Sequence, residues 1–213
     1  GTWVNSTRQS RLGAEGRQQA GDNELFVRVE FDFFGVGENQ GLVTPRLRHA
    51  YGAWGPVLIG QTNSLFMDID IFPNTIDYWG PAGMVFLRNP QFRWTFLDND
   101  TMRFAMAIEN PGTDPDPGDI RVIDPNLGAN IVASEEIPDL TAQFRYNGDW
   151  GHFQVAGIIR NIGFETLATP NNEPSDQMLG WGIDLTGTIK IGERNKFLLG
   201  FVFGEGIASY MND

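Results

Sequence analysis

The chain has 213 residues and a formal net charge of −12, with 27 Asp and Glu residues against 15 Lys and Arg residues. This balance argues against nucleic acid as a partner, because phosphate binding needs basic patches. The absence of cysteine excludes disulfide scaffolds and thiolate chemistry, and two histidines are too few for a multi-histidine centre, so we expect no metal and no cofactor. No apolar run is long enough for a membrane-spanning helix.

The first strong pattern along the chain is the segment ELFVRVEFDFF at Glu24–Phe34, in which apolar and charged residues alternate. A strand has a two-residue period, so these two kinds of side chain lie on opposite faces. A soluble sandwich can bury one such face, but many strands of this kind in series, with large aromatics on one face, predict an all-β transmembrane antiparallel barrel around water. The residues expected to point outward are Val27, Val29, Phe31, Phe33, Phe92, Trp94, Phe96, Phe104, Met106, Phe144, Phe197, Phe201 and Phe203.

The same patterns predict ten strands in chain order. They are Asn5–Gly16, Glu24–Phe34, Pro45–Trp54, Pro56–Asn63, Gln91–Leu97, Thr101–Glu109, Asp139–Tyr146, His152–Asn161, Met178–Ile191 and Lys196–Gly204. Short turns alternate with the long connections Ser64–Pro90, Asn110–Pro138 and Ile162–Gln177, which is typical of barrels with short turns on one rim and long loops on the other. We interpret residues 1–213 as one part of a longer barrel.

Strand parity also divides the charged residues between the two faces. The basic residues expected to face inward are Arg11, Arg28, Arg46, Arg48, Arg93, Arg103, Arg145, Arg160 and Lys190, and the acidic ones are Glu30, Asp32, Glu109, Asp139 and Asp184. Any single arginine here is best interpreted as the partner of an inward carboxylate. The excess of nine over five favours a basic wall that attracts anions.

The long connection Ser64–Pro90 is too apolar for a solvated external loop and contains too many Pro and Gly residues for one strand. We expect it to fold against the barrel wall, narrow the pore and present Asp68, Asp70 or Asp77 to the interior. The alternative is that this loop lies over a neighbouring subunit. Since no histidine or serine constellation accompanies these carboxylates, we do not expect an enzyme.

Several segments resemble known porins. SRLG at Ser10–Gly13, RLRHAYGAW at Arg46–Trp54 and VLIGQ at Val57–Gln61 resemble strands of general bacterial trimeric porins, and the DcaP-like porins are the most similar group. In that group a stretch much like LRHAYGAWGPVLIGQTNSLFMDID precedes DYWGP and RNPQFRWT, as it does here.

The resemblance implies a homotrimer in the outer membrane of Gram-negative bacteria, in contact with its lipid. It implies strands about two to eleven of a barrel with about sixteen strands, and passive diffusion of small hydrophilic solutes, with ion transport that favours anions of the dicarboxylate type. In general porins three basic wall residues face the acidic loop at the pore constriction, and motif alignment places these at Arg11, Arg48 and Arg88. The remaining inward cations would then line the pore wall.

Two other classes of protein stay open at this point. One is a structural or adhesive outer-membrane barrel without solute flux. The other is a soluble carbohydrate-binding or hydrolytic β-sandwich that uses Trp54, Trp79 and Trp94 as binding platforms, which the aromatic band around Trp94 disfavours.

Overall fold

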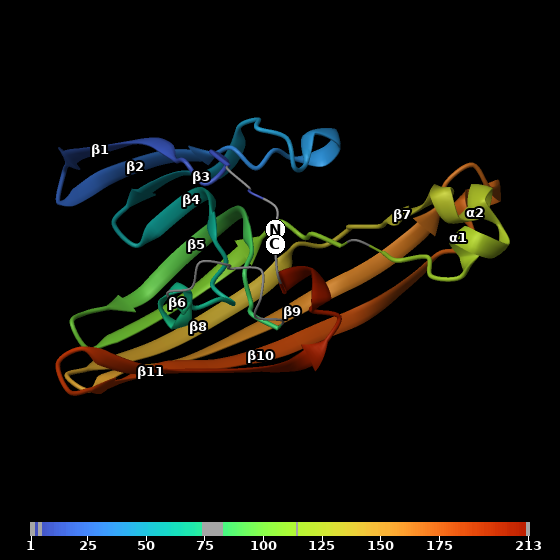
Figure 1. Cartoon of the computed structure of the whole chain (residues 1–213). Coiled ribbons are helices and arrows are strands. Elements are labelled where there is room, and N and C mark those ends of the chain that lie inside the picture. Colours follow the sequence, from blue (N-terminus) through green and yellow to red (C-terminus); the bar gives the residue numbers. More distant parts are fainter. Residues whose placement is uncertain (1–2, 4–5, 74–82, 114, 212–213) are drawn as a thin grey trace.

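The computed structural model describes residues 3, 6–73, 83–113 and 115–211, and it consists of one antiparallel sheet of eleven strands (Figure 1). The strands are β1 (Leu12–Ala20), β2 (Asn23–Asp32), β3 (Arg46–Trp54), β4 (Val57–Asn63), β5 (Arg88–Asp98), β6 (Met102–Glu109), β7 (Ile131–Ala133), β8 (Asp139–Gly148), β9 (Gly151–Thr166), β10 (Asp176–Ile191) and β11 (Asn195–Glu205). Neighbours in sequence pair in the sheet, except that β6 pairs with β8 and the short β7 pairs with the far end of β9.

The helical elements are short and lie in the connections. They are η1 (Gly37–Asn39), η2 (Ile69–Ile71), α1 (Ile120–Ile123), α2 (Pro125–Asn130), η3 (Pro170–Asn172) and η4 (Ala208–Tyr210). Among the described residues, no helix combines the length and the apolar character needed to cross a membrane.

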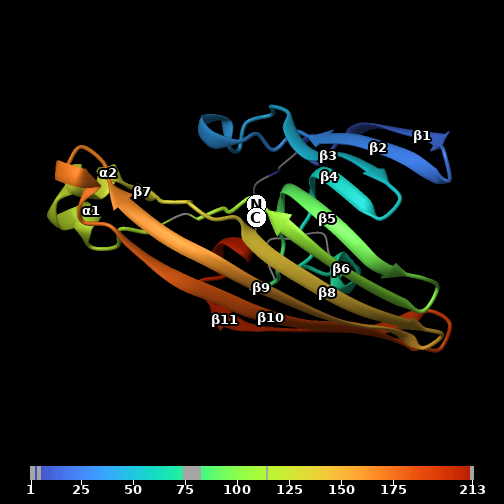
Figure 2. The same ribbon diagram turned by 180° about the vertical axis from the view of Figure 1, so that it is seen from behind.

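The sheet is strongly curved, and its two ends are edges. Among the described residues β1 pairs only with β2, and β11 pairs only with β10, so the strands form an open, curved wall. The views from the front and from behind show β1–β4 on one side of this wall and β8–β11 on the other (Figures 1 and 2). The β9–β10 hairpin extends beyond the other strands and carries β7, α1 and α2 at its tip.

The all-β, antiparallel prediction is confirmed, with two differences in detail. The first strand runs over Leu12–Ala20 rather than Asn5–Gly16, because its polar half GRQQA pairs with Asn23–Val27 although it shows no apolar alternation. The three-residue strand β7 and the helices α1 and α2 occupy the connection Asn110–Pro138, in which no element was predicted. There β7 pairs with the end of β9, and α2 packs against α1 and β7.

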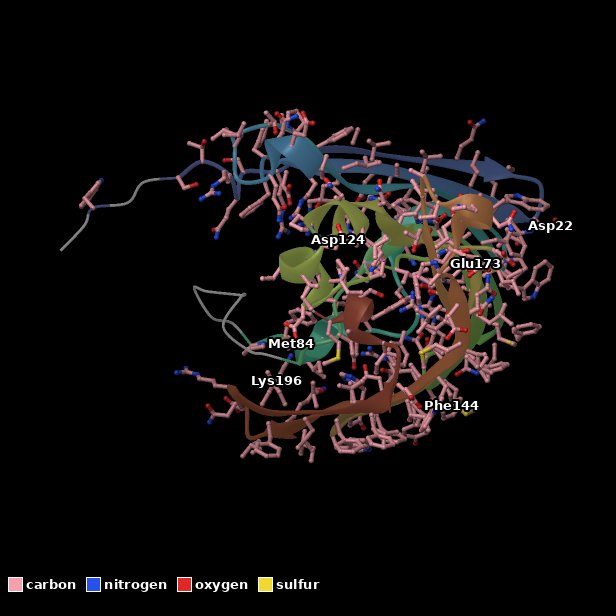
Figure 3. All side chains as sticks on the ribbon, turned by 90° about the vertical axis from the view of Figure 1, so that its right-hand side faces the viewer. Asp22, Met84, Asp124, Phe144, Glu173 and Lys196 are labelled. Carbon is pink, nitrogen blue, oxygen red and sulfur yellow. The ribbon has the colours of Figure 1, made fainter. Side chains whose placement is uncertain are left out.

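The two faces of the wall differ sharply in composition. Large apolar side chains on the convex face stay exposed, including Phe96 at 59%, Phe201 at 61% and Phe203 at 60%. The concave face, called the inner face below, carries polar and charged residues that are buried against one another, such as Gln91, Thr141 and Thr186. Figure 3 shows the aromatic rings projecting from the convex side of the curved ribbons. Such a wall is the reverse of a soluble sandwich, whose large apolar side chains would be enclosed.

Candidate functional site

The first part of the long connection lies on the inner face. Leu65, Phe66 and Met67 are at most 3% exposed. The Leu65 amide donates a hydrogen bond of 2.9 Å to Glu109 Oε1 of β6, and Gln154 Nε2 of β9 donates one of 3.1 Å to the Met67 carbonyl. The chain therefore crosses from the end of β4 to the strands β6 and β9 of the same curved wall.

Asp68 anchors this crossing. Its carboxylate accepts hydrogen bonds from His152 Nε2 at 2.6 Å and from the Thr186 hydroxyl at 2.8 Å, and it also pairs with Arg145 at 3.3 Å. The Thr188 hydroxyl lies 3.0 Å from His152 Nδ1, where it can donate to the second ring nitrogen. Since the Asp68 side chain is 1% exposed, it fixes the loop to three strands and is not itself open to solvent.

Asp70 is the exposed acid of the loop. Its carboxylate accepts a hydrogen bond of 2.6 Å from Arg145, while its side chain remains 53% exposed. Asp68, Asp70 and His152 offer ligand atoms within 4.8 Å of one another, a spacing that could hold a metal ion. Arg145 pairs with both carboxylates, so one positive charge faces two negative ones, and His152 Nε2 is already bonded to Asp68.

A second ion-pair cluster lies on β2 and β3. Arg46 pairs with Asp32 at 2.8 Å, and Arg48 pairs with Glu30 at 2.7 Å and with Asp32 at 3.1 Å. Glu30 also pairs with Arg28 at 2.6 Å. A bulge between the Glu30 and Phe31 pairings inserts Arg48 as an extra residue in β3, as expected where two residues oppose one. The bulge changes the parity of the rest of the strand, so His49 joins the inner face and bonds to Thr62 at 3.0 Å.

The three arginines that motif alignment placed at a constriction have different surroundings in the structure. Arg11 is exposed and lines a cavity of about 300 Å³ with Glu15, Arg28 and Glu30, while Arg48 forms an ion pair with Glu30. Arg88 is buried at the start of β5, with its guanidinium 4.5 Å from the centre of the Phe86 ring. The loop acids Asp68 and Asp70 contact Arg145 and not these residues, and Asp77 lies outside the described residues.

Other basic residues of the inner face have no carboxylate partner within the described residues. Arg93 donates to Gln91 Oε1 and to the Asn63 carbonyl. The Arg103 side chain has neither a hydrogen bond nor an ion pair to any described residue, and its Nε is buried without a partner. Both arginines line a cavity of about 350 Å³ together with Asp68 and Asp70.

A lysine pair continues this basic surface. Lys190 and Lys196 lie directly opposite each other in the β10–β11 register, and neither side chain forms an ion pair with a described residue. They line a second cavity of about 360 Å³, which shares Asp70, Arg145 and Asn147 with the first. Lys196 was not among the residues predicted to face inward, although its parity relative to the outward Phe197 could have revealed it.

A second inward segment follows β11. Arg160 is buried: its Nε pairs with Asp139 at 3.1 Å, and its other nitrogens donate to the Gly206 carbonyl, the Ser209 hydroxyl and the Gly112 carbonyl. Tyr210 is fully buried beside it and donates a hydrogen bond of 2.8 Å to Asp139. Burial, with the nearby Glu109 and Asp139, raises the pKa of the Tyr210 hydroxyl, so it stays a proton donor at physiological pH. The last predicted strand ended at Gly204, and sequence patterns gave no sign of this segment.

The sequence of this chain matches the model of a known protein family. The family described as DcaP outer membrane protein matches residues 3–212. The chain belongs to this family. A solved DcaP structure, the crystal structure of the outer membrane channel DcaP of Acinetobacter baumannii, superposes with a TM-score of 0.74 at 22% sequence identity. The match covers 92% of this chain and 52% of that one, so the chain spans about half the length of the DcaP channel. No curated protein matches this chain.

Membership of the DcaP family places the chain in the bacterial outer membrane, where the convex aromatic face meets lipid. We expect Phe201→Arg to destabilise the folded protein by about 2–4 kcal/mol, because a charge on the lipid face of a barrel costs that much near the bilayer midplane. The matched control is Leu198→Arg in the same strand, on the inner face. The measurement is the urea midpoint of the full-length protein folded into vesicles, and equal shifts for both variants would contradict this assignment of the faces.

Proposed function

We propose that this DcaP family member forms a water-filled pore across the outer membrane, through which small hydrophilic anions such as dicarboxylates diffuse passively. The proposed pore is completed by further strands to a barrel of about sixteen, assembles as a homotrimer, and is narrowed by the inward loop 64–90. The observation that carries the preference for anions is the set of inner-face cations without carboxylate partners among the described residues. They are Arg11, Arg93, Arg103, Lys190 and Lys196.

The distinction between paired and unpaired cations supports this proposal. Arg28, Arg46, Arg48 and Arg145 each contact a carboxylate, so their charge is largely cancelled. Arg103 and the two lysines form no ion pair with a described residue, and they line the cavities beside the loop. A narrow passage between low-dielectric walls concentrates such a field on passing ions, and an unpaired arginine can still bind a solute carboxylate with two parallel hydrogen bonds.

We expect the full-length protein in planar bilayers to conduct, with a reversal potential of the anion-selective sign in a salt gradient. The measurement should use low salt, because the Debye length is about 30 Å at 0.01 M and shrinks as salt increases. Vesicles containing the protein should take up succinate faster than 1,4-diaminobutane, which has the same chain length and the opposite charge. Cation selectivity would contradict the proposal, and the absence of conductance would favour a structural or adhesive barrel.

A further inference from the structure

Two chain segments far apart in sequence meet on the inner face. Phe66 and Met67 belong to the first half of the inward loop, Val85 belongs to its second half, and Ile207 and Tyr210 follow β11. All five are buried in one apolar cluster that rests on Ala156 and Ile158 of β9. An apolar cluster inside a polar wall needs an explanation, since the inner face of a pore is otherwise wet.

Tyr210 holds both halves of the loop by different contacts. Its ring packs edge-on against Phe66 with the ring centres 5.9 Å apart, which fixes the first half. Its carbonyl accepts a hydrogen bond of 2.9 Å from the Phe86 amide, and Met211 bridges antiparallel to Val85, which fixes the second half. A single residue and its neighbour therefore connect both halves of the loop.

The other side of Tyr210 is fixed to the wall. Glu109 and Asp139 lie directly opposite each other in the β6–β8 register and are both fully buried. The Tyr210 hydroxyl lies 2.8 Å from Asp139 Oδ2 and 3.4 Å from Glu109 Oε2, and the shorter distance assigns its proton to Asp139. The Arg160 guanidinium lies 4.8 Å from the centre of the Tyr210 ring, a cation–π contact.

Gly206 allows the chain to turn inward after β11. Its φ of +72° lies in the left-handed region, and a Cβ at this position would collide with Ile162. The turn directs Ile207–Met211 onto the inner face, where the backbone closes into η4. The inward course of this segment is thus built into the backbone and does not depend on Tyr210 alone.

We propose that Tyr210 is the clamp that holds both halves of the inward loop against the wall and so sets the width of the pore. This inference rests on the proposed channel function. Tyr210 is a positioning residue: it acts on solutes through the loop and does not contact them. Removing its side chain frees Phe66 and removes a hydrogen-bond donor from the buried Asp139 carboxylate, so the loop should fluctuate within the passage.

The first test compares Tyr210→Ala with Tyr210→Phe in the full-length protein. We expect Tyr210→Ala to increase open-channel current noise and to raise the rate of proteolytic cleavage within residues 64–87 by about tenfold, as loss of a local contact lowers the free energy of opening. Tyr210→Phe keeps the aromatic ring, so its open-channel current noise should be close to that of the wild type. Tyr146→Ala is the matched control, because Tyr146 is a half-exposed tyrosine that stacks on Trp150 away from the loop.

The second test uses a cross-link and does not require the loss of Tyr210. The chain has no cysteine, and residues paired across an antiparallel bridge have Cα atoms about 4.5–5.5 Å apart, within disulfide range. We expect Val85→Cys with Met211→Cys to form a disulfide, with dissolved oxygen as the oxidant that accepts the two electrons. In the Tyr210→Ala background the same disulfide should return the current noise to the wild-type level, and reduction should reverse this.

The outcomes separate the clamp from the channel. The clamp would be overturned if Tyr210→Ala had the same current noise and the same cleavage rate as the wild type. Failure of the cysteine pair to cross-link would also overturn it. A wild-type protein that does not conduct would overturn the channel function and with it the effect on pore width, while the cleavage and cross-linking assays would still decide whether Tyr210 holds the loop. If Tyr210→Ala does not assemble, the cross-link in the otherwise unchanged protein decides alone.

Discussion

Replacing Arg103, Lys190 and Lys196 by glutamate should convert the full-length pore from anion-preferring to cation-preferring. Each substitution reverses a charge that has no carboxylate partner among the described residues. At an effective dielectric constant of about 20, a unit charge about 8 Å from a permeating ion contributes about 2 kcal/mol. Three reversed charges should therefore change the ratio of anion to cation permeability by more than about tenfold.

The measurement for this variant is the reversal potential in a salt gradient, recorded at low and high salt. The shift should shrink at high salt, because screening weakens the interaction of exposed charges. Arg121→Glu is a matched control: it reverses a charge on α1, where the side chain is 63% exposed at the tip of the β9–β10 hairpin (Figure 1). A triple variant that keeps the anion preference of the wild type would show that these cations do not control selectivity.

Arg48 provides a contrast that tests where selectivity is set. After Arg48→Ala, Glu30 keeps Arg28 and Asp32 keeps Arg46 as partners, so the inner face changes by one partly cancelled charge. We expect Arg48→Ala to shift the reversal potential less than Arg103→Ala does. The opposite order would place the selective region at Arg11, Arg48 and Arg88, as the resemblance to general porins implies.

Strand parity predicted which side chains face outward, because a two-residue period leaves little freedom once one residue of a strand is assigned. The same rule placed Arg46 and Arg48 on one face. It could not show that they pair with Asp32 and Glu30, since pairing depends on the register between β2 and β3 and on the bulge at Arg48. His49 shows most clearly how the bulge defeats the parity rule. Simple parity places His49 outward, but its side chain is buried on the inner face.

The loop was harder to predict than the strands. Its apolar content indicated packing against a wall, and the first described part does lie on the inner face. The residues that receive it, His152, Thr186 and Arg145, come from three strands that follow it in the chain. No local pattern encodes such contacts, and the same is true of Tyr210, whose partners come from β5, β6 and β8.

Arg160→Ala should destabilise the full-length protein by about 3–5 kcal/mol, because removing one partner of a buried ion pair leaves the other charge uncompensated. The Arg160 side chain is 1% exposed and that of Asp139 is fully buried, so water cannot take the place of the guanidinium. The loss includes the hydrogen bonds to the Gly206 carbonyl and the Ser209 hydroxyl, which hold the second inward segment. Urea titration of the full-length protein in vesicles measures the effect.

Two further variants show how much of the destabilisation by Arg160→Ala comes from burial of the ion pair and how much from the charge left behind. Arg17→Ala removes an ion pair of similar length, 3.0 Å to Glu24, but both side chains are at least half exposed, and such pairs contribute about 0.2–1 kcal/mol. Replacing both partners, with Arg160→Met and Asp139→Leu, should recover much of the loss, because neither member of the ion pair is then left buried without the other. A double variant as unstable as Arg160→Ala would instead attribute the loss to the bonds that hold Gly206 and Ser209, which both variants lack.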